Sequence, residues 1–315
     1  MTGLTPAADV GAAAFLSPEA LAQLEQETPA RLAGVDLTPA LAAQIREMGR
    51  AMGAQRKADL QARFEVEVQG IEIAEIPVVR VRPREGHTQD RRILYLHGGA
   101  FAFGEAHDTG AMLLARRFGV EVLSVEYRLA PEHPFPAGLE DCEDVYRELA
   151  WGGGAKGLAV VGMSAGATLA ATMLSSAQAE GLDMPDAAIL LTPGADMKAI
   201  GDSLEANDGR DPVLSWTDQL DKALAAYVGE ADPEDPRLSP SRATYAPGYP
   251  RSVIVTGTRD VLLSPCVRLY WAMRRGGVEV DLRVWDGMWH GFMFSPDLPE
   301  AKACLDDIAA FLGWA

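Results

Sequence analysis

Cysteine and histidine are both scarce in this chain of 315 residues. The three cysteines, Cys142, Cys266 and Cys304, lie far apart and form no Cys-x-x-Cys pair. Such a set cannot supply a disulfide framework, and it favours a reducing compartment. The five histidines and three cysteines also lack the spacing of zinc ligands. We therefore expect no bound metal.

Basic runs are missing as well. Lysine and arginine total 28 against 45 aspartates and glutamates, which gives a formal net charge of -17. A chain with this charge repels a phosphate backbone, so we exclude nucleic acid as a partner. The first ten positions hold an acid and no base, unlike the start of a signal peptide. We therefore expect a cytoplasmic protein.

Long hydrophobic runs are also rare, with one exception. No charged residue occurs between Gly157 and Ala179, a stretch long enough to span a bilayer. Its first third is β-like, however, and the remainder is rich in alanine and interrupted by glycine, serine and threonine. That pattern is typical of a strand, a sharp turn and a buried helix. We therefore expect no membrane span and no membrane partner.

The chain does have a regular alternation of strand-like and helix-like segments, without internal repeats or low-complexity tracts. The strand-like runs fall at about 64–69, 71–82, 92–97, 120–126, 158–162, 187–192, 252–256 and 279–285. This alternation predicts an α/β protein with a mostly parallel, eight-stranded sheet flanked by helices. Gly70 joins the first two runs, which we expect to form an antiparallel hairpin.

Two regions depart from that alternation. Residues 1–60 are mostly helical in pattern, and Thr38 followed by Pro39 indicates a helix start. Residues 195–230 are loop-like apart from one amphipathic stretch. We interpret both as a helical cap over the carboxyl ends of the strands, where parallel sheets place their sites. The resulting division is a cap of 1–60 and 195–230 and a core of 61–194 and 231–315.

A serine stands at one of the strand-to-helix transitions. Positions 162–166 read Gly-Met-Ser-Ala-Gly, directly after the apolar strand 158–161 and before an Ala-rich helix. Glycines two positions before and after Ser164 leave room for a strained turn that pushes the serine Oγ toward a substrate. This context is typical of a nucleophile elbow, so Ser164 is the candidate nucleophile. The alternative is an ordinary glycine-rich turn.

A second glycine-rich turn follows an earlier strand. Positions 97–101 read His-Gly-Gly-Ala-Phe at the end of the apolar strand 93–96. The amides of Gly98 and Gly99 have no side chains to block them, and together with the amide of Ala165 they could bind a developing oxyanion. We expect an oxyanion hole here. The alternative is a tight turn without a ligand.

His290 is the candidate general base, because it lies just beyond the last predicted strand. Asp260 follows the strand 252–256 through a short turn, so its carboxylate should reach the same edge of the sheet as Ser164 and His290. The order serine, acid, histidine matches that of such triads on α/β sheets. Asp286 is the rival for the acid. The other histidines stand in turn, loop or proline-rich contexts, and we expect them to be structural.

Four segments of the chain resemble the hormone-sensitive lipase-like family of carboxylesterases in the α/β-hydrolase superfamily. They are 97–101, 127–137 (Tyr-Arg-Leu-Ala-Pro-Glu-His-Pro-Phe-Pro-Ala), 162–166 and 290–292, in the family's order. The resemblance implies an α/β-hydrolase fold with a helical cap and a serine esterase acting on short-chain acyl esters. Three features depart from the family's pattern: Ala100 replaces the usual third glycine, Met163 precedes the nucleophile, and the residues after Asp260 differ from the common Asp-Pro-Leu form.

Further side chains are expected to shape the substrate pocket or support the site. The pocket candidates are Ala100, Phe101, Met163, Trp216 and Phe292. The cap should add the apolar side chains of Phe15, Leu16, Leu21, Met48, Met52 and Leu220. In contrast, we expect Arg128 and Glu132 to hold the proline-rich loop through ion pairs.

The predicted chemistry is acyl transfer from an ester to Ser164 and then to water, without metal or organic cofactor. Two alternatives stay open. One is lactone or amide hydrolysis by the same mechanism, and the other is a non-catalytic homologue that binds a small ligand. The expected partner is a small-molecule ester. A homodimer is left open.

Overall fold

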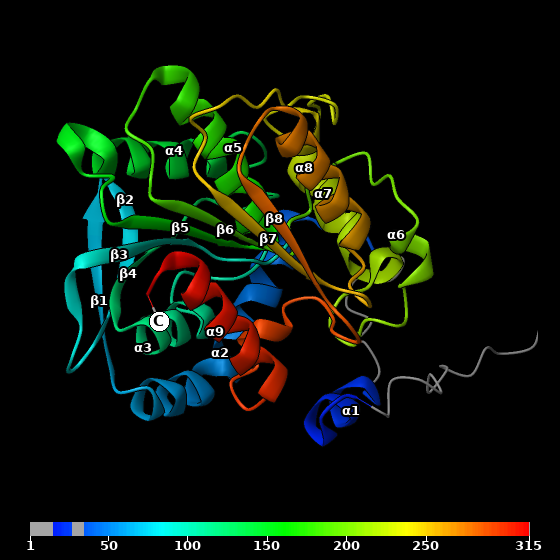
Figure 1. Cartoon of the computed structure of the whole chain (residues 1–315). Coiled ribbons are helices and arrows are strands. Elements are labelled where there is room, and N and C mark those ends of the chain that lie inside the picture. Colours follow the sequence, from blue (N-terminus) through cyan, green and yellow to red (C-terminus); the bar gives the residue numbers. More distant parts are fainter. Residues whose placement is uncertain (1–14, 27–34, 315) are drawn as a thin grey trace, which may run out of the picture.

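The computed structural model describes residues 15–26 and 35–314, and its centre is one eight-stranded sheet (Figure 1). The strands are β1 (Val66–Ile73), β2 (Ile76–Pro83), β3 (Thr88–Leu96), β4 (Val120–Val125), β5 (Leu158–Met163), β6 (Ala187–Leu191), β7 (Ser252–Gly257) and β8 (Val280–Trp285). Their order across the sheet is β1-β2-β4-β3-β5-β6-β7-β8. The β1–β2 and β2–β4 pairs are antiparallel, and all later neighbours are parallel. The predicted mostly parallel sheet is thereby confirmed.

The central strands are apolar throughout because both of their faces are buried. Every residue of β5, β6 and β7 is buried. Successive side chains of a strand point to opposite faces, so Val160 joins one hydrophobic cluster and Val161 the other. A strand covered on both sides by helices therefore appears in the sequence as a continuous apolar run.

Helices cover both faces of the sheet, as Figure 1 shows. One face packs against α4 (Ala137–Ala150), α5 (Ala165–Glu180) and α8 (Leu263–Arg275). The other packs against α3 (Thr109–Phe118) and α9 (Pro299–Leu312). This arrangement leaves the carboxyl ends of the parallel strands as the edge where loops from several strands meet.

The hairpin at the sheet's edge forms as predicted, but its turn was misplaced. Gly70 lies inside β1, opposite Val79, and the strands are joined at Ala74 and Glu75. These two residues adopt left-handed φ values of 51° and 65°. Positive φ at both central residues is the geometry of a type I′ turn, which matches the twist of the flanking strands. Glycine is not needed within the strand, and the turn occurs without it.

Helices outside the sheet layers come from the two regions that break the alternation. From the amino-terminal region come α1 (Pro18–Leu24) and α2 (Pro39–Arg63). The Thr38 hydroxyl accepts a hydrogen bond from the Leu41 amide at 3.3 Å, which confirms the predicted helix start. The later region forms α6 (Ser203–Ala206), a π-helical turn (Trp216–Leu220) and α7 (Asp221–Val228). The structure does not describe residues 1–14 and 27–34, so the expectations for these positions lie outside the described residues.

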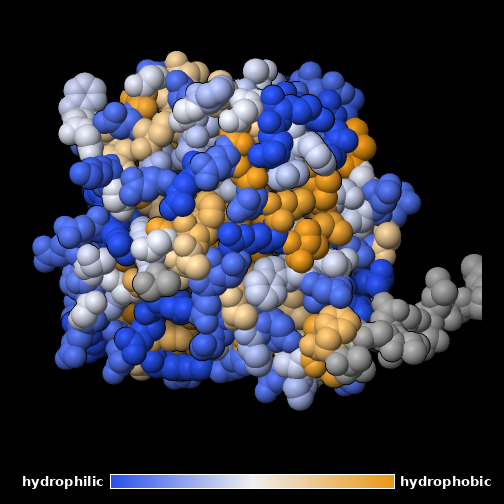
Figure 2. Space-filling view, viewed as in Figure 1, coloured by the Kyte–Doolittle hydropathy of each residue, from blue (hydrophilic) through white to orange (hydrophobic). Residues whose placement is uncertain are grey.

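The remaining elements are short 3-10 turns, and the surface is largely hydrophilic. The turns are Trp151–Gly153, Pro240–Arg242 and Phe292–Phe294. The uncharged run 157–179 forms β5 and most of α5, in the interior. Within 15–26 and 35–314, no helix has both the length and the apolar character needed to cross a membrane. Figure 2 shows polar side chains over most of the visible face, with an apolar patch over β8 and the neighbouring part of α8.

The turn geometry predicts a stabilising substitution. Glu75→Gly should raise the free energy of unfolding by about 0.5–1 kcal/mol, because glycine adopts a positive φ without the steric cost that a side chain imposes. Glu85→Gly is the matched control, since Glu85 lies in the next loop and has no positive φ. It should lower stability slightly by increasing the entropy of the unfolded chain. Urea unfolding of both variants measures the difference, and an equal effect at the two positions would contradict the turn assignment.

Candidate active site

Ser164 occupies the sharp turn between β5 and α5. Its backbone has a φ of 54° and a ψ of -118°, outside the regions that residues with a side chain normally adopt. The turn is held by a 2.8 Å hydrogen bond from the Ser164 amide to the Leu191 carbonyl of the neighbouring strand. Strained backbone of this kind persists only where its surroundings determine it, and it concentrates at functional sites.

The glycines on either side of Ser164 are required by crowding. A Cβ on Gly162 would lie 2.4 Å from the Gly166 carbonyl oxygen, within the turn itself. A Cβ on Gly166 would lie 2.0 Å from the Leu96 carbonyl oxygen at the end of β3. Neither glycine has a positive φ. The Gly-x-Ser-x-Gly spacing therefore allows β3, β5 and α5 to approach closely around the serine.

His290 lies between Ser164 and Asp260 in one chain of hydrogen bonds. His290 Nε2 is 2.9 Å from Ser164 Oγ, and His290 Nδ1 is 3.1 Å from Asp260 Oδ1. All three residues are buried, with Asp260 wholly inaccessible. The loops after β5, β7 and β8 carry one member each. Parallel strands place these loops at the same edge of the sheet, and this brings distant residues together.

The Asp260 carboxylate is held by its own loop. Its Oδ1 accepts the Leu262 amide at 2.8 Å, and its Oδ2 accepts the Thr256 hydroxyl at 2.9 Å. The rival acid, Asp286, is exposed, and its carboxylate accepts a hydrogen bond from the Thr258 hydroxyl at 3.1 Å. Of the two carboxylates, the one that contacts His290 is Asp260.

Two opposing effects act on His290. Burial lowers its pKa, but the charge of Asp260, the hydrogen bond to Asp260 and the charge of Asp211 together raise its pKa above 6.5. Burial disfavours the charged imidazolium, whereas nearby carboxylates favour it. A histidine in this environment accepts a proton readily once it is neutral, as a general base must.

The turn at 97–101 lies directly against the serine. A Cβ on Gly98 would lie 3.3 Å from the Ser164 Cβ, and Gly99 has a φ of 121° that favours glycine. Among the described residues, none accepts a hydrogen bond from the Gly98 or Gly99 amide. The amide of Ala165 begins α5 and so has no acceptor within its helix. These three donors are available to an oxyanion.

His97 contacts both this turn and Tyr127. Its ring stacks on Tyr127 with centroids 4.2 Å apart, and its Nδ1 lies 2.7 Å from the Gly98 carbonyl oxygen. Burial is the main reason that the pKa of His97 falls to about 4. The imidazole is therefore neutral at ordinary pH, which is consistent with a structural role.

The proline-rich loop 127–137 is held as expected, by ion pairs between Arg128 and Asp141 and between Glu132 and Arg46 of α2.

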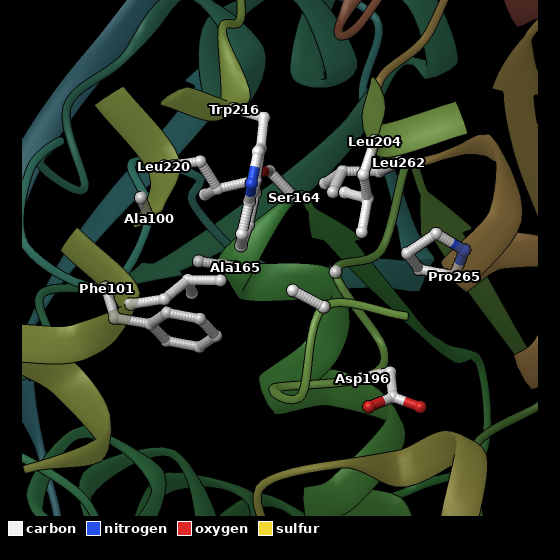
Figure 3. A pocket seen from close by; sticks show the side chains of 13 residues that line it. Ala100, Phe101, Ser164, Ala165, Asp196, Leu204, Trp216, Leu220, Leu262 and Pro265 are labelled. Atoms are coloured by element: carbon white, nitrogen blue, oxygen red, sulfur yellow. The ribbon is translucent and has the colours of Figure 1, made fainter. Parts of the chain in front are cut away.

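Two cavities of different size meet at Ser164. The smaller has a volume of about 20 Å³ and is walled by apolar side chains, among them Phe101, Trp216, Leu220 and Leu262. Figure 3 shows these side chains grouped around Ser164 and Ala165, with Asp196 at the far rim. Asp196 is neutralised there by Arg268, whose Nε is 3.1 Å from Asp196 Oδ2. A volume of this size holds about one water-sized group.

The larger cavity is a cleft of about 420 Å³ that is also lined by Ser164. Its walls include Gly98, Gly99, His290 and residues of α2 such as Ile45 and Arg50. Ala100 and Leu220 line both cavities. Ser164 thus lines both a narrow apolar recess and a wider cleft.

Four of the five expected pocket residues line a cavity at Ser164. Phe101 and Trp216 line the narrow recess, Met163 lines the wide cleft, and Ala100 lines both. Phe292 needs correction: it is wholly buried and packs against Trp285 with ring centroids 5.9 Å apart, lining neither cavity. Phe292 lies two residues after His290, and the chain changes direction at Gly291, which has a φ of 72°.

The expected cap residues also behave differently from one another. Leu220 lines both cavities, whereas Leu16 and Leu21 pack in the hydrophobic cluster on the α3 and α9 side of the sheet. Phe15, Met48 and Met52 are exposed. On α2 the turn that faces the cleft carries Ile45, Arg46, Gly49 and Arg50 instead. Which face of a weakly amphipathic helix points inward depends on its neighbours.

Two residues near the triad were not anticipated. Asp211 and Asn207 belong to the later irregular region, and both side chains are buried beside the loops of His290 and Asp260. In the sequence they stand in an Asp/Gly-rich stretch that is typical of an exposed loop. No local signal distinguishes such polar residues from solvated ones.

Within the described residues, no group of three or more histidine, cysteine or acidic side chains is arranged for a metal ion.

Comparison with known proteins identifies the family and the relatives of this chain. A family model described as alpha/beta hydrolase fold matches residues 93–294. An esterase of Acinetobacter venetianus is 32% identical over 251 residues, covering 78% of this chain and 82% of the relative. An acetyl-hydrolase of Streptomyces hygroscopicus is 33% identical over 233 residues, covering 73% and 77%.

Solved structures extend the likeness to almost the whole chain. Esterase E25 superimposes with a TM-score of 0.87 at 29% identity, covering 99% of this chain and 97% of that one. An esterase from the bacterial hormone-sensitive lipase family gives a TM-score of 0.74 at 31% identity, covering 88% and 98%. The chain therefore belongs to the hormone-sensitive lipase-like family of the α/β-hydrolase superfamily.

Asp260 and its rival Asp286 give different predictions for the same substitution. Asp260→Asn should lower kcat by about 10⁴-fold, because an amide preserves the shape but favours the wrong imidazole tautomer. Asp286→Asn is the matched control and should stay within about threefold of the wild type, since its carboxylate is exposed and bonded to Thr258. Steady-state hydrolysis of p-nitrophenyl acetate measures both. A greater loss in Asp286→Asn would mean that the acid is misassigned.

Proposed function

We propose that this protein is a serine carboxylesterase that hydrolyses short-chain acyl esters, with Ser164 as nucleophile, His290 as general base and Asp260 as the acid that orients it. The observation that carries the proposal is the chain of hydrogen bonds of 2.9 and 3.1 Å that joins the three side chains. Family membership and relatives named esterase and acetyl-hydrolase support it.

The first half of the reaction forms an acyl-enzyme. His290 Nε2 removes the proton from Ser164 Oγ as the oxygen attacks the ester carbonyl carbon. Negative charge moves to the carbonyl oxygen, where the amides of Gly98, Gly99 and Ala165 donate hydrogen bonds. The imidazolium then passes its proton to the alcohol oxygen as the bond from carbon to that oxygen breaks. The alcohol leaves, and the acyl group stays on Ser164.

The second half repeats these steps with water. His290, again neutral, removes a proton from a water molecule that attacks the acyl carbon, and the oxyanion is held by the same three amides. The imidazolium returns the proton to Ser164 Oγ as the acyl bond breaks. Asp260 accepts a hydrogen bond from Nδ1–H throughout, which leaves Nε2 unprotonated before each attack and stabilises the imidazolium that forms.

The narrow recess supports a preference for short acyl chains. At about 20 Å³ it accommodates a methyl-sized group without movement of its walls. Each longer acyl chain requires displacement of side chains such as Trp216 or Leu262, and displacing packed side chains is unfavourable. The wider cleft, at about 420 Å³, suits the alcohol part of the ester. We therefore assign the acyl group to the recess and the alcohol to the cleft.

The cap is part of the same proposal. Residues 1–60 and 195–230 would form it, because α2 contributes to the cleft and Trp216 and Leu220 contribute to the recess. No observation favours lactone or amide hydrolysis over ester hydrolysis. The intact hydrogen-bonded triad argues against a protein that only binds a ligand. A small-molecule ester is the proposed partner, a cytoplasmic location stays a prediction, and a homodimer is left open.

Removal of the nucleophile tests the proposal directly. Ser164→Ala should reduce turnover of p-nitrophenyl acetate by at least about 10⁴-fold, because the attacking oxygen is gone. Unfolding should be nearly unchanged, since little packing is lost. An organophosphonate probe should label the wild type and not the variant, as seen by mass spectrometry. Wild-type turnover in Ser164→Ala, or labelling at another serine, would refute the assignment.

The recess predicts how activity depends on acyl length. With p-nitrophenyl esters below their aggregation limit, kcat/KM should be highest at two to four carbons. Trp216→Ala removes one wall and should shift the optimum to longer chains, raising the C8/C2 ratio by about tenfold. Trp151→Ala is the control, because Trp151 is 80% exposed and lines neither cavity. A wild-type preference for C12–C16 esters would show that the recess does not hold the acyl chain.

A further inference from the structure

We infer that Asp211 is a positioning residue for the esterase reaction: its carboxylate holds the backbone of His290 and links this base to the segment that walls the substrate cavities. The inference rests on the proposed function. It names a residue outside the triad, in a region that the sequence marks only as a loop. Three observations support it, namely a shared carboxylate, a second tether beside it and the charge it brings to His290.

The first observation is how the Asp211 carboxylate is shared. Its Oδ2 accepts the His290 amide at 2.9 Å. Its Oδ1 accepts the amides of Val213 and Leu214 at 2.8 and 3.0 Å. Val213 and Leu214 line the wide cleft beside His290. One buried side chain therefore connects the base to the wall that a substrate would touch.

The hydrogen bond to the His290 amide restrains the residue whose ring must point at Ser164. The preceding residues Met288 and Trp289 are buried, but the following residue, Gly291, has a φ of 72° and starts a new turn. His290 thus lies where the chain changes direction. A hydrogen bond to its own amide restrains rotation about the backbone and so helps to keep Nε2 directed at Ser164.

The second observation is a pair of hydrogen bonds from the same segment to the loop that carries Asp260. The side chain of Asn207 donates to the carbonyl oxygens of Thr258 and Asp260 at 3.1 and 2.8 Å. Asn207 is buried. Asn207 and Asp211 are also joined to each other through a 3.2 Å backbone hydrogen bond. The segment 207–211 therefore contacts both loops that carry His290 and Asp260.

The third observation is the charge around His290. Asp260 faces it from the loop after β7, Asp211 faces it from the irregular region, and Ser164 faces it from the elbow. Across the cleft lie Arg46, Arg50 and Glu105, and Arg259 is buried next to Asp260 in the chain. Asp211 helps to raise the pKa of His290, after Asp260. Burial and then repulsion from Asp260 raise the pKa of Asp211 itself to about 6.

Both oxygens of Asp211 accept backbone amides, Oδ2 that of His290 and Oδ1 those of Val213 and Leu214. An asparagine has one accepting oxygen and an NH2 group that only donates, so it cannot accept all three amides. The carboxylate accepts all three, at the cost of burying a charge beside a second carboxylate. The charge has one favourable effect in this environment, which is to stabilise the imidazolium that forms when Ser164 loses its proton. Asp211 thus combines geometric restraint with electrostatic support.

The test compares Asp211→Asn with Asp208→Asn. Asp208 lies in the same segment, but its carboxylate binds Ser215 and Thr217 rather than His290. Two readouts are used: the pH dependence of kcat/KM for p-nitrophenyl acetate, and an NMR titration of the His290 ring protons. His290→Gln identifies that resonance among the five histidines. The NMR titration does not depend on turnover.

In Asp211→Asn, loss of the negative charge should lower the pKa of His290 by about one unit. His290 must be neutral to act, so the acid limb of the pH profile should move to lower pH by the same amount. At pH 8 kcat should fall about tenfold, with a smaller change in KM. Asp208→Asn should leave the His290 titration at the wild-type value.

Asp211→Glu separates charge from position. It keeps the carboxylate but moves its oxygens, so kcat should fall while the pKa of His290 stays near the wild-type value. The inference is wrong if His290 titrates in Asp211→Asn as in the wild type, or if Asp208→Asn shifts it equally. If wild-type protein hydrolyses no ester while the His290 titration shifts as expected, the proposed function fails and the contact between Asp211 and His290 stands.

Discussion

The hydrogen bond between Ser164 Oγ and His290 Nε2 is the interaction on which the site depends, and it joins residues 126 positions apart. It can form because β5 and β8 lie in one parallel sheet, whose carboxyl ends present their loops at the same edge. Close packing at the elbow adds the second condition. The glycines around Ser164 let α5 and β3 approach so closely that a single added carbon would collide with a carbonyl oxygen. The strained serine is held in place by the core beneath it.

The irregular region between β6 and β7 has two connected roles around this bond. Its π-helical turn brings Trp216 and Leu220 to the recess, and Asp208 holds that turn through Ser215 and Thr217. Its preceding residues, Asn207 and Asp211, contact the loops of the acid and the base. Substrate walls and catalytic loops are thus parts of one hydrogen-bonded unit. These hydrogen bonds fix the positions of the loop residues although the loop lacks regular secondary structure.

Electrostatics around His290 differ from those of the surface. The chain as a whole carries a formal charge of -17, but most of that charge is solvated and acts weakly over distance. Asp260 and Asp211 are both fully buried next to the imidazole. In a low-dielectric interior two carboxylates strongly favour the imidazolium over neutral imidazole. This local field, rather than the net charge, sets the proton affinity of the base.

The sequence alone determined the sheet, the serine turn and the pairing of Ser164 with His290 and Asp260 as candidates. Buried parallel strands are continuous apolar runs, and strained turns need glycine at set positions, so both leave local signals. Only the tertiary structure decided where side chains without such signals lie. It moved the hairpin turn from Gly70 to Ala74 and Glu75, placed Phe292 in the core, turned Met48 and Met52 to solvent and buried Asp211 beside His290. The positions of Phe292, Met48, Met52 and Asp211 depend on packing partners far away in the sequence, and a local pattern contains no information about them.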